Sequence, residues 1–243
     1  MRSLLIVPAH TVMAWDTLAA TAADAIVLDL SMPGPVERIQ ASREQAAALL
    51  RASRDRPIAT GDKLIFAGLN PFNSGMTHDD VAAVVSVGLT GVVLPDACGQ
   101  GVERLDALLA VAEAEADLPD GSIGIIAIVG DHARNLLSME TLTGASPRLA
   151  GIGWDAKRLS TSVGAETPLQ ADGTLSDLCR LGHSMTLVAA AAAGVRAIDT
   201  AFVTPDNPKE EASQARRSGF SAKFGQNTAE IDAINAAFRA KGG

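Results

Sequence analysis

The sequence predicts a single (β/α)8 barrel, in which eight parallel strands close into a cylinder surrounded by helices. Eight short apolar runs rich in β-branched residues recur along the 243 residues, and a longer segment with helical periodicity follows each run. Most runs are apolar at nearly every position, which is typical of parallel strands covered on both faces. A doubly wound open sheet is the runner-up, but the Gly-rich dinucleotide fingerprint is missing after the first run.

The elements can be placed in order along the chain. The expected strands are Ser3–Pro8, Ala25–Leu30, Lys63–Leu69, Gly91–Pro95, Ile123–Val129, Leu149–Trp154, Ala197–Phe202 and Phe220–Phe224. Between them, Thr77 followed by Asp80 predicts a helix start, and Thr174 opens a similar segment. Gly194 predicts the end of an alanine-rich helix. No linker or internal repeat divides the chain, so residues 1–243 are expected to form one domain.

Composition and charge exclude several classes of function. The chain has 20 Lys and Arg against 28 Asp and Glu, a formal net charge of −8, and 47% hydrophobic residues. An acidic chain without a basic run does not suit nucleic acid or an anionic membrane surface. No apolar stretch approaches the roughly 20 residues that cross a bilayer. The two isolated cysteines, Cys98 and Cys179, are neither a disulfide framework nor a metal ribbon, and a cytoplasmic protein is expected.

The candidate functional residues lie where the predicted strands end. In a (β/α)8 barrel the active site is built at the C-terminal ends of the strands. There the sequence brings polar residues together from distant parts of the chain, which predicts a pocket for a small molecule. His132, beside Asp131, is the best placed of the histidines for acid–base chemistry, and a surface histidine at a helix start is the equally ordinary alternative. The residues expected to contact a substrate are Asp29, Asn70, Pro95, Asp96 and Trp154.

Several of these residues also have a structural interpretation. Asp131 is either a metal ligand or base, or the N-cap of the helix it opens. Asp29 is either a pocket carboxylate or the partner of a buried arginine such as Arg43, with the second slightly favoured. Asn70 either orients a ligand or marks a turn before the proline that follows, and the turn is favoured. Trp154 is either barrel core or pocket wall.

Seven segments carry a family resemblance, and they run in a fixed order over essentially the whole chain. They are RSLLIVPAH, DAIVLDL, LNPF, GVVLP, SPRLAGIGWDAKRLSTSVGA, AAAGVRAIDTAF and RRSGFSAKF. This ordered set resembles the citrate lyase β-chain branch of the HpcH/HpaI aldolase superfamily, which includes enzymes of the malyl-CoA lyase and citramalyl-CoA lyase type. The resemblance implies a (β/α)8 barrel, bound Mg2+, trimer-based homo-oligomers, and cleavage or formation of a C–C bond beside a thioester carbonyl.

The sequence departs from the resembled family where charged residues are expected. Asp131 keeps an acid after the fifth strand, as a shorter side chain than the usual Glu. The printed sequence ends just past the eighth predicted helix, so a barrel without the C-terminal lid extension of longer relatives is expected. The other replacements are Ser31 and Met32 for two acids, Gly68 for a carboxylate-gripping arginine, Asp96 for a lysine, and Lys157 and Arg158 for an acid pair.

The replacement at Arg158 bears most directly on the metal. A guanidinium cannot bind Mg2+ and repels it, so Arg158 at an expected ligand position argues against the magnesium that the resemblance implies. Our hypothesis is that the charge of Arg158 takes the place of the cation and pairs with Asp131, which makes both residues candidates for catalysis. Asp155, three positions before Arg158, is the alternative, because it could join Asp131 as a metal ligand.

The resemblance implies a C–C lyase or aldolase acting on the CoA thioester of a small hydroxy-dicarboxylic acid, with a degenerate metal site. Two alternatives stay open. One is a non-catalytic relative that binds a ligand or a partner subunit, and the other is a metal-independent hydrolase in the same pocket, because fold alone does not fix function. The expected partners are a small acid or an acyl-CoA, together with further copies of this chain.

Overall fold

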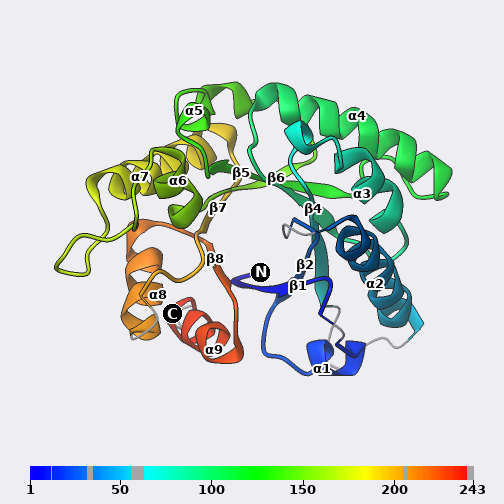
Figure 1. Ribbon diagram of the computed structural model, residues 1–243, viewed down its shortest axis with the longest axis horizontal. Helices are drawn as coiled ribbons and strands as arrows, with labels where there is room; N and C mark the ends of the chain where they lie inside the picture. Colours follow the sequence, from blue (N-terminus) through cyan, green and yellow to red (C-terminus); the bar gives the residue numbers. More distant parts are fainter. Residues whose placement is uncertain (12, 32–34, 56–62, 205–206, 240–243) are drawn as a thin grey trace.

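The centre of the molecule is a closed barrel of eight parallel strands. The computed structural model describes residues 1–11, 13–31, 35–55, 63–204 and 207–239. The strands pair in chain order, and the first closes the barrel against the last (Figure 1). The predicted barrel is confirmed and the open sheet is excluded. The strands are β1 Ser3–Pro8, β2 Ala25–Asp29, β3 Leu64–Gly68, β4 Gly91–Leu94, β5 Gly124–Gly130, β6 Leu149–Trp154, β7 Arg196–Asp199 and β8 Ala222–Gly225.

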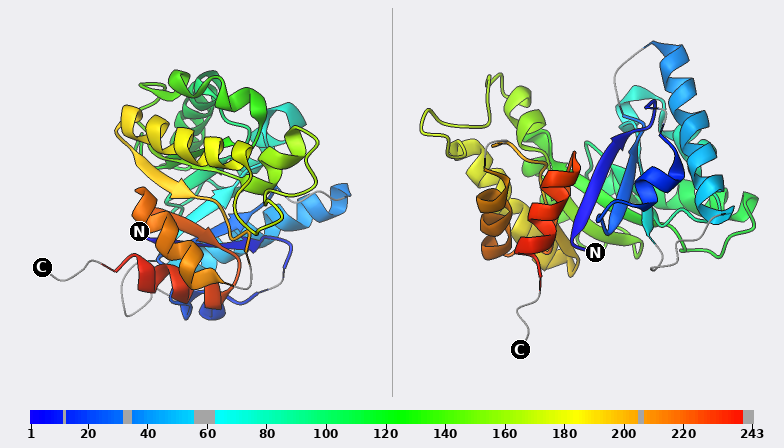
Figure 2. Two further views of the ribbon diagram at one scale, coloured as in Figure 1. Left: turned by 90° about the vertical axis from the view of Figure 1, so that its left-hand side faces the viewer. Right: turned by 90° about the horizontal axis from the view of Figure 1, so that it is seen from below.

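Helices surround the barrel between successive strands (Figures 1 and 2). The loop of residues 163–176, between α6 and α7, extends away from the body of the molecule (Figure 2). No helix in the described ranges is long and apolar enough to cross a membrane. The helices are α1 Trp15–Ala19, α2 Val36–Asp55, α3 Thr77–Val84, α4 Gly99–Glu115, α5 Ala133–Leu136, α6 Ala156–Ser162, α7 Asp177–Ala193, α8 Pro208–Ser218 and α9 Thr228–Ala237, with 3-10 turns η1 Phe72–Ser74 and η2 Met139–Leu142.

Two helices begin differently from the prediction. Thr77 is the first residue of α3, and its hydroxyl donates to the carbonyl of Asn70 instead of capping the helix. At α7 the N-cap is Ser176, whose Oγ accepts a hydrogen bond from the Cys179 amide, so Thr174 lies before the helix. Gly194 ends α7 in the left-handed conformation at φ 69°, as expected of a glycine C-cap.

The strands are apolar throughout because each strand has two buried faces. Successive residues of β2 illustrate this: Val27 belongs to the cluster that fills the barrel, and Leu28 belongs to the larger cluster between sheet and helices. Strand β7 ends at Asp199, three residues before its predicted end, because the apolar run continues beyond the sheet into Phe202, which is buried in the outer cluster. Apolarity therefore located the strand but overestimated its length.

A closed ionic cluster holds the N-terminal end of the barrel together. Arg148, directly before β6, is only 3% exposed and makes two contacts of 2.8 Å with the carboxylate of Glu113 on α4. Its guanidinium also contacts Asp106 and Asp120. Glu113 in turn accepts hydrogen bonds from the loop before β5, including 2.7 Å from the Ile123 amide. The cluster ties α4, β5 and β6 to one another.

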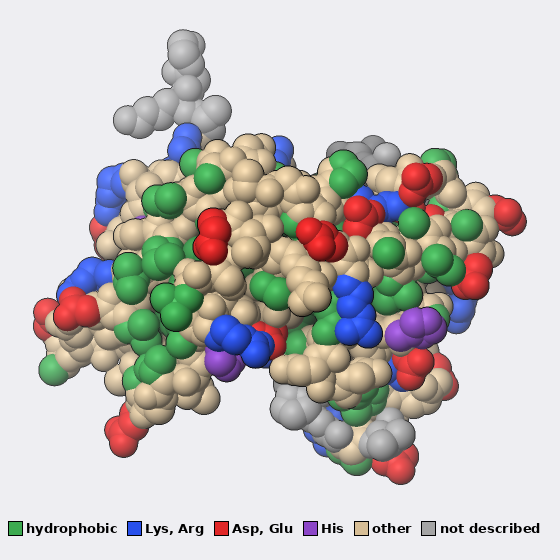
Figure 3. All heavy atoms as spheres, turned by 90° about the horizontal axis from the view of Figure 1, so that it is seen from above, with side chains coloured by type: hydrophobic (Ala, Val, Ile, Leu, Met, Phe, Trp, Pro, Cys, Tyr) green, Lys and Arg blue, Asp and Glu red, His purple; other side chains and the backbone are tan. Residues whose placement is uncertain are grey.

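The exposed charges of the chain do not gather by sign on the face drawn in Figure 3. Acidic and basic side chains are interspersed there, with hydrophobic side chains between them. Such a mixed surface differs from the continuous basic face that binds phosphate backbones.

Candidate functional site

A cavity of about 110 Å3 lies at the C-terminal mouth of the barrel, where the active sites of this architecture are built. Its apolar wall comes from strand ends, and its charged lining residues are Asp29, Asp155 and Arg158. Pro95 and Trp154, two of the residues expected to contact a substrate, also line it. The cavity therefore brings together residues from β2, β4, β6 and α6 that are far apart in the chain.

Asp29 ends β2 and faces this cavity. Its Oδ1 accepts hydrogen bonds of 2.9 Å from the Ser31 amide and 2.6 Å from the Ser31 hydroxyl. Gly68 on the neighbouring strand leaves room for this arrangement, because a Cβ there would lie 3.1 Å from Oδ1. The favoured pairing of Asp29 with Arg43 is wrong: Arg43 contacts Asp80 at 2.8 Å instead. The other expected acid position, Met32, lies outside the described residues.

Asp131 follows β5 and is deeply buried, with 1% of its side chain exposed. Its Oδ2 accepts a 2.8 Å hydrogen bond from the amide of Asp96, while Oδ1 has no hydrogen-bond partner among the described residues. Burial raises the pKa of Asp131 to about 6, against the opposing effects of the Asp96 amide and the nearby guanidinium of Arg158. The N-cap interpretation of Asp131 is wrong, because His132 caps α5.

Arg158 lies in the first turn of α6 and is half-exposed toward the cavity. Its Nη1 is 3.9 Å from Oδ2 of Asp131, so the two side chains form the ion pair that the sequence hypothesis required. The contact is longer than a hydrogen bond, which leaves guanidinium donors available for another anion. Asp155 is the N-cap of the same helix, and its Oδ1 accepts a 3.0 Å hydrogen bond from the Arg158 amide.

Asp96 supports this arrangement from the neighbouring strand end without lining the cavity. Its backbone has φ 52°, an uncommon conformation for a residue with a side chain. In this conformation the Asp96 amide donates a hydrogen bond to Asp131. The Asp96 side chain accepts hydrogen bonds of 2.7 Å from Asn135 and 3.1 Å from Asn73. Asp96 is therefore a residue that positions Asp131, and it does not line the pocket in which it was expected to contact substrate.

His132 and Asn70 lie outside the lining of the cavity. The Nδ1 of His132 accepts a 3.2 Å hydrogen bond from the Arg134 amide, and the side chain is exposed at the start of α5. Asn70 is buried, and its Nδ2 donates 2.9 Å to Asp80 and 3.2 Å to the carbonyl of Leu30. His132 thus caps a helix and Asn70 holds a loop in place, and the structural interpretation of Asn70 agrees with these contacts.

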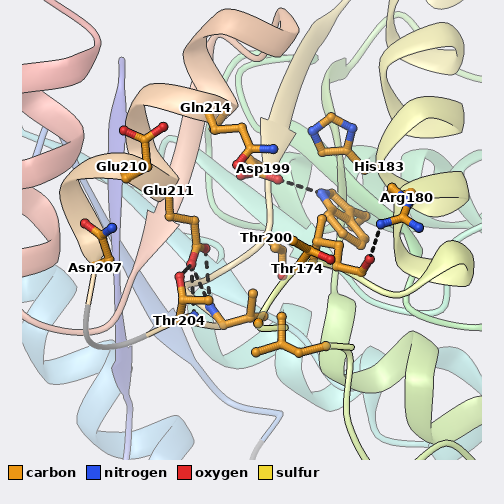
Figure 4. Close-up of a pocket in the computed structure, with 16 residues that line it drawn as sticks. Thr174, Arg180, His183, Asp199, Thr200, Thr204, Asn207, Glu210, Glu211 and Gln214 are labelled. Atoms are coloured by element: carbon orange, nitrogen blue, oxygen red, sulfur yellow. Dashed lines mark hydrogen bonds between the residues drawn. The ribbon is translucent and has the colours of Figure 1, made fainter. Parts of the chain in front are cut away.

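A second, larger cavity of about 500 Å3 lies between α7 and α8 and was not predicted from the sequence (Figure 4). Trp154 lines both cavities and forms a wall between them, with its indole Nε1 donating 2.7 Å to Asp199. Gly130 makes this position of Trp154 possible, because a Cβ on Gly130 would lie 2.5 Å from that of Trp154. The tryptophan is therefore both core and pocket wall.

The mouth does not fit a magnesium site built from several carboxylates. Within the ranges that the structure describes, no three His, Cys, Asp or Glu side chains gather so as to hold a metal ion. Asp155 caps a helix, and the guanidinium of Arg158 faces Asp131 where a cation would have to lie. The half-exposed guanidinium of Arg158 at the mouth is instead suited to bind an anion.

Comparisons with known proteins agree with the fold. A family model described as HpcH/HpaI aldolase/citrate lyase matches residues 2–227. The "Citrate lyase subunit beta-like protein" of Mycobacterium tuberculosis is 28% identical over 227 residues, which is 91% of this chain and 73% of that protein.

Two solved structures from the same organism are similar over nearly the whole chain. Protein CitE of Mycobacterium tuberculosis in complex with magnesium and acetoacetate superposes with a TM-score of 0.77 at 25% identity, covering 99% of this chain and 91% of that chain. The same protein in complex with magnesium, acetoacetate and coenzyme A gives a TM-score of 0.73 at 23% identity, covering 99% and 81%. The second match shows the barrel fold alone.

Proposed function

Because the chain belongs to the HpcH/HpaI aldolase/citrate lyase family, we propose that it cleaves, or forms, a C–C bond in the CoA thioester of a small hydroxy-dicarboxylic acid of the malyl-CoA or citramalyl-CoA type. The observation that carries the proposal is that Asp29 and Arg158 line the mouth cavity together, beside the helix cap Asp155, and would supply a base and an anion-holding group. The complex of a similar barrel with magnesium and acetoacetate supports a small acid as substrate.

Arg158 would hold the acid end of the substrate. A guanidinium can bind a carboxylate through two parallel hydrogen bonds, which fixes orientation as well as charge. Asp131 lies behind Arg158 at 3.9 Å and would position the guanidinium without touching the substrate, because its side chain is buried. The cavity of about 110 Å3 suits the small acid part of the thioester.

Asp29 would move the proton in the reaction. Its carboxylate takes the proton of the substrate hydroxyl as the C–C bond breaks, and the bonding electron pair passes to the carbon beside the thioester carbonyl. The resulting enolate takes a proton back at that carbon, which gives acetyl-CoA and glyoxylate from malyl-CoA, or acetyl-CoA and pyruvate from citramalyl-CoA. Arg158 would balance the negative charge of the acid and of the oxyanion that develops.

The test is an incubation with malyl-CoA and with citramalyl-CoA, in the presence of Mg2+ or of a chelator. We expect release of glyoxylate or pyruvate that persists in the chelator and is lost in Arg158→Ala and Asp29→Asn. Arg51→Ala, which removes an exposed arginine of α2, is the matched control and should leave turnover unchanged.

Other outcomes would replace the proposal with a different function. Thermal stabilisation by the thioesters without turnover would indicate a ligand-binding relative. Release of free CoA and the intact hydroxy acid would indicate a hydrolase. Turnover that stops in the chelator would contradict the role given to Arg158.

A further inference from the structure

The cavity between α7 and α8 has the size and the composition of a separate binding site. Its volume of about 500 Å3 falls in the range of small-molecule sites, which are mostly apolar with a few placed polar groups. Apolar side chains from the loop before α7 and from α8 form part of the wall. His183 of α7 and Gln214 of α8 face it from opposite sides (Figure 4).

The buried charges behind the cavity are already satisfied by one another. Lys223 is fully buried, and its Nζ lies 2.8 Å from Asp199, 3.0 Å from Glu211 and 2.8 Å from the carbonyl of Thr200. The second oxygen of Asp199 accepts from the Trp154 indole. Although burial alone would lower the pKa of Lys223, its two carboxylate partners raise it, so the ammonium stays charged.

This closed network leaves one net negative charge beneath the cavity, from two carboxylates and one ammonium. The charged residues at the rim are paired as well, Arg180 with Asp177 and Glu210 with Arg217. Among the residues that the structure describes, an anion in the cavity would therefore meet the carboxylates of the network without gaining an unpaired cation. A neutral or cationic ligand is not repelled by the negative charge of the network.

His183 supplies a free hydrogen-bonding group of the wall. Its ring packs edge-on against Trp154, with centroids 5.9 Å apart, and against Phe220, with centroids 4.9 Å apart. In the part of the chain that the structure describes, neither ring nitrogen has a hydrogen-bond partner. Burial lowers the pKa of His183 below its ordinary value, so the imidazole is neutral near pH 7 and has one accepting nitrogen.

We propose that this cavity is a second ligand site, which takes a small planar molecule carrying N–H donors of the amide or amidine class, with His183 as hydrogen-bond acceptor. The site is independent of the reaction proposed for the barrel mouth. It selects against carboxylates because the buried network beneath it carries a net negative charge and no unpaired cation lines it among the described residues. At the mouth, by contrast, the half-exposed guanidinium of Arg158 is available to a carboxylate.

Three probes of nearly identical shape test this selection: benzamidine, benzamide and benzoate. In NMR titrations we expect the cationic and the neutral probe to shift the ring resonances of His183 and the indole Nε1–H resonance of Trp154, and benzoate at equal concentration to leave them unchanged. His183→Ala should weaken benzamidine binding by roughly five- to tenfold, the value of one hydrogen bond. His78→Ala, at an exposed histidine of α3, is the matched control and should have no effect.

A second variant keeps the test valid if His183→Ala does not fold. Gln214→Trp places a large side chain from the exposed face of α8 into the cavity and should abolish the shifts while the fold is retained. Binding of benzoate at least as tight as that of benzamidine would overturn the proposal. So would the absence of shifts with all three probes, or shifts that persist in Gln214→Trp.

Discussion

The two ends of the barrel each hold a buried carboxylate beside an arginine, and the two pairs differ in how completely they are satisfied. At the N-terminal end, Arg148 is enclosed and contacts Glu113 twice at 2.8 Å. At the mouth, Arg158 is 45% exposed and reaches Asp131 only at 3.9 Å, and one oxygen of Asp131 has no partner in the described ranges. The charge at the closed end holds strands together, and the charge at the mouth is left available to a ligand.

The pKa directions of the two carboxyls show the same difference. Burial alone would raise the pKa of both groups. For Glu113, hydrogen bonds from Arg148 and from the amides of Ile123 and Gly121 outweigh burial and lower the pKa. For Asp131, burial outweighs its single amide donor and the guanidinium of Arg158 3.9 Å away, so the pKa rises to about 6. Burial destabilises a charge only where its partners are incomplete.

The largest effect is expected at the closed end. Arg148→Ala leaves Glu113 buried without its cation, and removing one partner of a buried ion pair costs about 3–5 kcal/mol. Urea unfolding monitored by circular dichroism measures the loss. The exposed Arg51→Ala on α2 serves as the control, with an expected change within about 0.5 kcal/mol. A loss below about 1 kcal/mol for Arg148→Ala would erase the distinction between the two ends.

At the mouth, Asp131→Asn should stabilise the protein at alkaline pH. The folded-state pKa of about 6 lies above the ordinary aspartate value of 3.8, so the folded protein binds this proton more tightly than the unfolded chain does. The resulting stability is present at low pH and is lost as pH rises through about 6, a difference of up to about 3 kcal/mol. Unfolding free energies of the variant and the wild type at pH 5 and pH 8 measure the part of this loss that falls between those pH values, about 1.4 kcal/mol. A stability difference that does not grow with pH would contradict the buried, under-paired state of Asp131.

Arg158→Ala should lose ligand affinity with little loss of stability. An exposed pair of this length contributes about 0–1 kcal/mol to folding, whereas charge-assisted hydrogen bonds to an anion contribute about 1.5–3 kcal/mol. We therefore expect roughly 10- to 100-fold weaker binding of pyruvate by isothermal titration. Arg158→Lys keeps the positive charge but loses the planar guanidinium, so its affinity for pyruvate should lie between those of the wild type and Arg158→Ala. Equal pyruvate binding by wild type and Arg158→Ala would remove the ligand role from the mouth.

The smallest effect is expected at Ser31. Ser31→Ala removes the hydroxyl that donates 2.6 Å to Asp29 but keeps the amide donor, so the expected cost is about 1 kcal/mol of stability. Thermal unfolding measures this cost. A loss as large as that of Arg148→Ala would mean that the mouth, like the closed end, is organised for stability.

The barrel was predictable from the sequence because its strands are buried on both faces. The run around Val27 and Leu28 is apolar at successive positions because both faces of the strand are buried, whichever strands it pairs with. The same reasoning located Asp29, Asp131 and Arg158, since the C-terminal ends of parallel strands meet at one rim.

Pairings within the rim could not be predicted, because they depend on local backbone geometry and lateral packing. The amide of Asp96 donates to Asp131 because Asp96 has a backbone φ of 52°, and no pattern in the sequence predicted a positive φ at this aspartate. Likewise, Arg43 of α2 pairs with Asp80 of the neighbouring helix α3 and not with Asp29.

The cavity between α7 and α8 was missed because it is walled by helices, whereas the strand-end rule considers only the rim. One signal was available in the sequence. Cys179, Gly182 and Thr186 lie on the buried face of α7 at helical spacing, and His183 falls beside them. A histidine next to a buried small-residue face would have been a candidate for a cavity wall.

The position of Trp154 gives the molecule a built-in optical reporter. The chain has two tryptophans, and Trp154 alone separates the two cavities, with its indole nitrogen anchored to Asp199. In a Trp15→Phe background, fluorescence emission comes from this indole alone. An occupant of either cavity changes the surroundings of the same fluorophore, so one spectrum follows both compartments without a label.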